Sequence, residues 1–152
     1  MYVNAYLLII GERLGKRLEV RQEIDETLLD WYVPRLILQP LVENAVEHGA
    51  GSHQKGLVII RAKHLGEDKM CIEVINDGPL SREDEQKVAW LLSDETDSEN
   101  ETALNIGIRN VHQRLRMLYG PDYGLSIKTD KNEHTVSSFC IQNKQEPQDN
   151  PR

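Results

Sequence analysis

The stretch V-P-R-L-I-L-Q-P-L-V-E-N-A-V-E-H-G-A-G, from Val33 to Gly51, decides how the rest of the chain is interpreted. Its apolar residues repeat at the i, i+4 spacing of a buried helix face, in two neighbouring rows: Ile37, Leu41, Ala45 and Leu38, Val42. Its second half also holds four polar side chains: Glu43, Asn44, Glu47 and His48. Because polar groups in a core are costly unless they are paired, these residues either line a site or form the wet face of an ordinary helix.

Two prolines and two glycines set the limits of this predicted helix. Pro34 suits a first turn, where its missing N–H has no partner to lose. Pro40 falls inside the helix, where a proline removes a backbone hydrogen bond at a cost of about 3 kcal/mol, so we expect a kink or a fresh start near Leu38. Gly49 and Gly51 supply the stop.

The composition is that of one globular domain. The chain has 152 residues, of which 39% are hydrophobic and 28% charged, enough for a sizeable core. The net charge of −7 and the lack of a basic block argue against nucleic-acid binding. The apolar patch at residues 5–10 lacks the flanks of a signal peptide and is too short to span a bilayer. Cys71 and Cys140 lie in apolar runs without metal-ligand spacing, so we expect buried thiols in a reducing compartment, the cytoplasm.

The remaining elements follow from periodicity and turn residues. Helices are predicted at residues 2–17, from Ser81 as N-cap through Leu92, and from Gly107 to Gly120; strands are predicted at 18–24, 57–63, 70–75, 124–129 and 135–141. Residues 25–32 form a connection with a helical turn, and residues 65–69 a hairpin link. Because no strand–helix–strand repeat runs through this order, the fold class is α/β: a two-layer sandwich with a mixed, mostly antiparallel sheet and helices on one face.

Two segments lack an apolar period. Residues 93–105 hold five acidic residues and no basic one, which predicts a mobile loop that would lie over a pocket as a lid. The polar residues from 142 onward predict a disordered tail. The chain therefore divides into a helix at 1–17 that looks like the end of a longer segment, a folded domain at 18–142, and a tail at 143–152.

Three glycine-bearing points interrupt this scaffold: the helix end around Asn44 and His48, the turn Asn76-Asp77-Gly78-Pro79, and Asn105 to Asn110 around Gly107. Gly107 is expected at a helix N-terminus, where free N–H groups favour a phosphate. An amide oxygen such as that of Asn44 suits Mg²⁺. Each point also has an ordinary structural explanation, since Asn-Asp-Gly-Pro is a good turn and Asn105 a good helix cap.

Here the residues carry a resemblance. L-Q-P-L-V-E-N-A-V-E-H-G, at residues 38–49, resembles the N box of the GHKL (Bergerat-fold) ATPases, closest to the LytS/YesM-like sensor histidine kinases. N-I-G-I-R-N-V-H-Q-R-L-R-M-L-Y-G, at residues 105–120, is similar to that group's G2 box and following helix, and N-D-G-P lies where the G1 box belongs. The resemblance extends from about Tyr6 to Ile141.

The resemblance implies ATP bound with Mg²⁺ between the sheet and the helices, under the lid. It assigns Asn44 as the Mg²⁺ ligand, Glu43 as a catalytic helper near the γ-phosphate and His48 as a phosphate neighbour. Gly107 would be the hinge of the lid, and Arg109 and Asn110 would lie near the phosphates. Around the adenine it places Asn76, in the position of the family's Asp, together with Asp77, Gly78 and Thr135.

This sequence departs from the family pattern at the G1 box, where the family has Asp-Asn-Gly-x-Gly. Asn76 and Asp77 stand in swapped order, and Leu80 replaces the second glycine. Asn76 can accept a hydrogen bond from an adenine amino group, without the added strength of a charged acceptor. Asp77 is the alternative, but a shift by one residue turns a strand side chain to the other face.

The resemblance also implies partners. Kinases of this group phosphorylate a histidine in a His-Phe context on a preceding helical dimerisation segment, and none of the five histidines here has that setting. We therefore expect the catalytic fragment of a membrane receptor, acting in a homodimer on that segment and then on a response regulator.

Three alternatives remain within this fold. The altered G1 box is also compatible with a docking module of little or no nucleotide affinity. A protein-serine kinase acting on a regulator is a second alternative, which the helical stretch from Tyr6 to Lys16 and the G2 string disfavour. An ATP hydrolase would need a glutamate one helical turn before Asn44, where Pro40 stands.

Overall fold

The computed structural model describes residues 2–14, 18–49, 56–93 and 103–143. Its elements are, in chain order, α1 (Val3–Leu14), β1 (Leu18–Ile24), the 3₁₀ helix η1 (Glu26–Leu28), α2 (Arg35–Gly49), β2 (Gly56–Leu65), β3 (Lys69–Asp77), α3 (Arg82–Leu91), α4 (Ala103–Tyr119), β4 (Ser126–Thr129) and β5 (His134–Gln142). The predicted order of helices and strands is confirmed. The largest difference is at the start of α4, which begins at Ala103 and not at the predicted Gly107. In the last hairpin, β4 starts two residues later than predicted and β5 one residue earlier.

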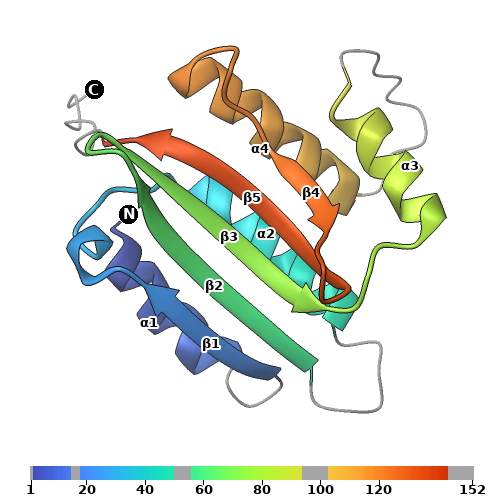
Figure 1. Cartoon of the computed structure of the whole chain (residues 1–152), viewed down its shortest axis with the longest axis horizontal. Coiled ribbons are helices and arrows are strands. Elements are labelled where there is room, and N and C mark those ends of the chain that lie inside the picture. Colours follow the sequence, from blue (N-terminus) through green and yellow to red (C-terminus); the bar gives the residue numbers. More distant parts are fainter. Residues whose placement is uncertain (1, 15–17, 50–55, 94–102, 144–152) are drawn as a thin grey trace.

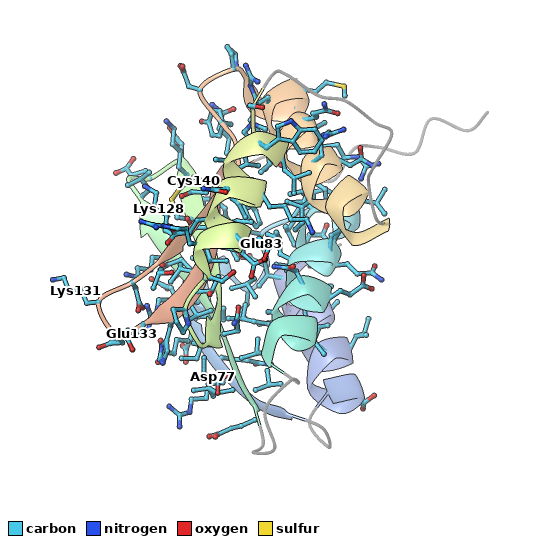
Figure 2. All side chains as sticks on the ribbon, turned by 90° about the vertical axis from the view of Figure 1, so that its right-hand side faces the viewer. Asp77, Glu83, Lys128, Lys131, Glu133 and Cys140 are labelled. Atoms are coloured by element: carbon cyan, nitrogen blue, oxygen red, sulfur yellow. A yellow bond between two sulfur atoms is a disulfide. The ribbon has the colours of Figure 1, made fainter. Side chains whose placement is uncertain are left out.

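The five strands form one sheet in the order β1-β2-β3-β5-β4. β1 pairs with β2 in parallel, and the other neighbouring strands are antiparallel. Helices α1, α2 and α4 lie behind the sheet in Figure 1, and the side view in Figure 2 shows them on one side of it. The predicted two-layer sandwich with a mixed, mostly antiparallel sheet is confirmed.

Alternation along the central strands decides which residues enter the core. In β3, Met70, Ile72, Val74 and Asn76 are buried, and in β5 the same holds for Thr135, Ser137, Phe139 and Ile141. Because side chains alternate across a sheet, these residues share the face that the helices cover. At the end of each row nearest Asp77, the apolar series gives way to polar side chains: Asn76 in β3, and Ser137 and Thr135 in β5.

Helix α2 packs against β2, β3 and α4, and its predicted stripe of Ile37, Leu38, Leu41, Val42 and Ala45 is buried. The predicted fresh start near Leu38 is wrong, because α2 continues through Pro40. The carbonyl that loses its bond to Pro40 belongs to Leu36, whose side chain is 54% exposed, so water can replace the missing donor. Burial of the stripe outweighs the cost of the proline.

The two cysteines contradict the expectation of buried thiols. Cys71 in β3 and Cys140 in β5 are half-buried and form a disulfide. They are direct partners in the register of the two strands, although they lie 69 residues apart in the chain. Local sequence carries no information on that register, so the apolar setting of each cysteine does not predict their pairing.

Helix α1 joins the same core through Val3, Tyr6, Leu7 and Ile10. The division at residue 17 between a preceding segment and the folded domain stays a prediction, and most of the polar tail falls outside the described residues. Gln142 and Asn143, which the prediction placed at its start, are held: Gln142 belongs to β5, and the Asn143 N–H donates to the Asp68 carbonyl. None of the helices in the described ranges has both the length and the apolar content needed to cross a membrane.

Candidate nucleotide site

The centre of the site is a pair of buried polar residues on adjacent strands. Asn76 in β3 and Thr135 in β5 are register partners and are 3% and 4% exposed. Both belong to the rows that face the helices. The Asn76 amide donates from Nδ2 to the carbonyl of Asp77 at 3.3 Å, which leaves its own carbonyl oxygen as an acceptor.

A turn held by side chains follows this pair. The Thr135 hydroxyl donates to the Gly78 carbonyl at 2.8 Å, and the Leu80 N–H donates to the Thr129 hydroxyl oxygen at 3.1 Å. Gly78 has φ of 108°, a conformation that side-chain-bearing residues rarely adopt. The turn is therefore fixed to β4 and β5 at a defined position beside Asn76.

The Asp77 side chain contacts the start of β2 and does not share the face of Asn76. Its carboxylate accepts the Leu57 N–H at 3.2 Å, at the start of β2, and it is only half-buried. Asp77 is the last residue of β3, and Figure 2 shows it at the lower end of the strands. Of the two candidates for contact with a base, Asn76 is thus the one on the face covered by the helices.

The polar half of α2 is divided between interior and solvent. Asn44 is 8% exposed, whereas Glu43 is exposed and accepts a hydrogen bond from Gln39 Nε2 at 3.2 Å. His48 lies in the last turn of the helix, and its side chain falls outside the described residues. Asn44 therefore belongs to an inner wall, and Glu43 to its rim.

Helix α4 corrects one expectation. It begins at Ala103, so Gly107 lies in the second turn and not at the N-terminus, and its own N–H is within the helical hydrogen-bond pattern. Residues 103–105 directly follow the acidic run and are too few to show a helical period of their own, so the sequence predicts a later start for the helix. Gly107 instead lies where α4 packs against α2: a Cβ built on it would be 3.7 Å from Pro40 Cβ.

The two other predicted residues of α4 have different surroundings. Arg109 is 8% exposed, and its guanidinium carbon lies 5.0 Å from the centre of the Trp90 ring in α3. This is a cation–π contact between the two helices. Asn110 is exposed. The predicted lid, residues 93–105, falls outside the described residues except at its two ends.

The donor set near Asn44 fits Mg²⁺ in one particular way. Among the described residues, no group of three or more His, Cys, Asp or Glu side chains could hold a metal. Mg²⁺ in nucleotide sites needs only one or two protein oxygens, because phosphates and water complete its shell. A single buried amide oxygen is compatible with that mode and not with a cage made entirely of protein.

Three residues near the site were not predicted. Ser137 is 3% exposed and follows Thr135 on the same face of β5, a position that strand alternation could have identified. Thr129 fixes the turn, and Trp90 covers Arg109. The last two depend on long-range contacts that no local pattern carries.

Comparison with known proteins shows which proteins this chain is similar to. No protein-family model matches the chain. It is 34% identical over 135 residues to the sensor histidine kinase BtsS of Escherichia coli, covering 88% of this chain and 21% of that protein. It is 33% identical over 133 residues to the sensor protein LytS of Oceanobacillus iheyensis, covering 86% and 22%. The chain thus spans about a fifth of the length of these relatives.

Among solved structures, the catalytic domain of the histidine kinase ThkA superposes with a TM-score of 0.67 at 19% identity, covering 95% of this chain and 92% of that one. That likeness confirms the fold, and the sequence relatives identify the group within it. The chain belongs to the GHKL (Bergerat-fold) family, with the catalytic domains of the LytS/YesM-like sensor histidine kinases.

Proposed function

We propose that this chain binds ATP with Mg²⁺ and is the kinase domain of a two-component sensor. It would transfer the γ-phosphate of ATP to a histidine on a helical dimerisation segment. The observation that supports this most is the alignment of buried Asn76 and Thr135 on the helix-covered face, with buried Asn44 on the helix that packs against it. Buried polar groups need partners, and the hydrogen bonds of Asn76 and Thr135 to the turn hold these polar side chains in fixed positions on that face.

The base would be recognised at Asn76. Because its Nδ2 already donates to the Asp77 carbonyl, Asn76 offers an acceptor, which matches the amino group of adenine. The Thr135 hydroxyl is occupied by the Gly78 carbonyl, so Thr135 would act by holding the Gly78 turn against the base. Asp77 would support the same turn through its bond to the start of β2.

The phosphates would lie toward α2 and α4. Asn44 would hold Mg²⁺, which neutralises phosphate charge in phosphoryl transfer. Arg109 would supply positive charge, and Asn110 and His48 would be neighbours of the phosphates. Glu43, at the rim, would be positioned to orient the incoming histidine. Catalysis of this kind depends mainly on positioning and charge neutralisation, so one acidic helper is sufficient.

The partners follow from the relatives. Sensor kinases act as receptors, and the histidine kinase ThkA has been crystallised in complex with the response regulator TrrA. We infer that this domain acts within a longer homodimeric receptor anchored in the membrane through a preceding region. The domain itself would lie in the cytoplasm and serve a cognate response regulator. Residues 1–17 would be the end of the dimerisation segment.

The test is calorimetric titration of ATP into the chain with and without Mg²⁺. We expect binding with a Kd below the millimolar range, strengthened by Mg²⁺. Asn44→Ala should remove the Mg²⁺ dependence, because the metal loses the side-chain oxygen proposed to hold it. Asn4→Ala provides the matched control, since Asn4 is an exposed asparagine on α1. The proposal fails if millimolar ATP gives no binding in either condition.

Two observations favour a second candidate, a docking module of low nucleotide affinity. Asn76 lacks the charge of the family's carboxylate, and Arg109 is engaged with Trp90. Addition of a separately purified dimerisation segment decides between the two. A kinase would transfer ³²P from ATP to that segment in an Mg²⁺-dependent reaction, whereas a docking module would bind the segment without labelling it.

A further inference from the structure

The outer face of the sheet carries a feature that nucleotide binding does not use. The Cys71–Cys140 disulfide joins the middle strands β3 and β5. Residues 71 and 140 alternate out of phase with the buried rows, so they lie on the face away from the helices. Figure 2 shows Cys140 on that side together with Lys128, and both cysteines are half-buried.

A cavity of about 320 Å³ opens beside this disulfide, and Cys140 lines it while Cys71 does not. The other polar side chains in its wall are Lys69, Asp122, Tyr123, Ser126 and Ser138. Lys69 is held in place, since its ammonium lies 5.4 Å from the centre of the Tyr123 ring. The cavity therefore offers one cation, one anion and three hydroxyl groups close to a sulfur atom.

We propose that Cys140 and Cys71 form a site of thiol–disulfide exchange for small zwitterionic, amino-acid-like disulfides. In the reduced protein, the Cys140 thiolate attacks one sulfur of the small disulfide. A mixed disulfide forms on Cys140, and one small thiol leaves. The Cys71 thiolate then attacks Cys140 Sγ, the Cys71–Cys140 bond forms, and the second small thiol leaves. Two protein thiols are oxidised and one small disulfide is reduced to two thiols, so atoms and electrons balance.

The geometry assigns an order to the two cysteines. Only Cys140 faces the cavity, so it is the attacking and modified residue, and Cys71 resolves the mixed disulfide. Lys69 matches the carboxylate of an amino-acid-like compound and Asp122 its ammonium group. Half-exposed disulfides are the ones that exchange with small thiols, in contrast to deeply buried structural ones.

The disulfide would link the same two strands that carry Asn76 and Thr135, on the opposite face of the sheet. Cys71 precedes Asn76 by five residues on β3, and Cys140 follows Thr135 by five residues on β5. A link between the strands opposes their separation, so amide exchange at Asn76 and Thr135 should slow on oxidation. This inference does not require that the chain bind nucleotide.

The experiment uses oxidised glutathione as the probe on the reduced full chain, with free thiols counted by alkylation and mass spectrometry. Cys71→Ser should accumulate one glutathionyl group on Cys140, whereas Cys140→Ser should react about tenfold more slowly. With the wild-type protein, the uncharged probe 2-hydroxyethyl disulfide should react about tenfold more slowly than oxidised glutathione. In Lys69→Met, most of this difference in rate between the two probes should disappear. In glutathione buffers the wild type should switch reversibly between dithiol and disulfide.

The switch should also be visible in stability. The oxidised chain should melt on the order of 10 °C above the reduced chain, since the bond closes a loop of 69 residues. Three results would overturn the proposal: a disulfide that resists excess reduced glutathione, thiols that never oxidise, or equal capture of glutathione by both single variants. Calorimetry with ATP on the same samples reports separately on the proposed kinase function.

Discussion

Replacing Asn76 with Asp should raise ATP affinity and lower the stability of the empty domain at the same time. Asn76→Asp supplies the charged acceptor that the family uses. A charged hydrogen bond is about twice as strong as a neutral one, a gain of about 1 kcal/mol or about fivefold in Kd. The cost arises because the new carboxylate would take a position that is 3% exposed and cannot donate to the Asp77 carbonyl, as the amide does at 3.3 Å.

Without ATP, loss of that bond and burial of the charge should cost about 2 kcal/mol, which lowers the melting temperature by about 4–8 °C. Saturating ATP should recover most of the loss. Calorimetry gives Kd, and thermal melts with and without nucleotide give the two stabilities. An unchanged Kd would refute the assignment of Asn76 to the base. Asp77→Asn tests the alternative: it should leave Kd unchanged, and a loss of binding there would identify Asp77 as the base-binding residue.

Three further predictions concern how the site is supported. Gly124→Ala should destabilise the chain by about 2 kcal/mol, because its Cβ would lie 2.7 Å from His112 Cε1 and would disturb the 3.0 Å hydrogen bond that the Leu125 N–H donates to His112. Urea titration measures this loss. In the same titration Gly11→Ala should be neutral or stabilising, because the atom nearest to its added Cβ lies 3.9 Å away. The His134 N–H donates to the Asp130 carboxylate and lowers the pKa of Asp130 below 3.8. The stabilisation from this hydrogen bond is therefore present above that pH and is lost as the pH falls below it. Asp130→Asn should reduce the loss of stability at acid pH in pH-dependent unfolding curves. Ser81→Ala should cost about 1 kcal/mol, because it removes the N-cap bond to the Asp84 N–H, and an unchanged urea midpoint would contradict that.

Local patterns predicted most of the fold because the deciding forces are local there. The alternation at residues 18–24 and the cap at Ser81 each specify an element through neighbours in sequence, and both are confirmed. Pro40 shows where this fails. The proline rule concerns one backbone bond, whereas the helix is held by a buried stripe on both sides of it, and the larger burial term decides.

The site could be predicted only in part, because some of its contacts join residues that are far apart in the sequence. Asn44 and Asn76 lie in motifs that the resemblance identifies, and the structure places both in the interior. The resemblance also named Thr135, but its hydrogen bond to Gly78 joins residues 57 positions apart. The Trp90 contact with Arg109 likewise depends on how α3 and α4 pack, which short-range sequence does not encode.

The swapped order of Asn76 and Asp77 now has a physical interpretation. A strand has two faces. The residue at the inner position must tolerate burial, whereas the next residue, on the outer face, need not. Asn76 at the inner position is neutral and donates to the Asp77 carbonyl, so the empty domain carries no buried negative charge at this position. Asp77 at the outer position uses its charge to fix the start of β2. The exchange therefore trades affinity for nucleotide against stability of the empty domain, and the sign of both changes in Asn76→Asp follows from it.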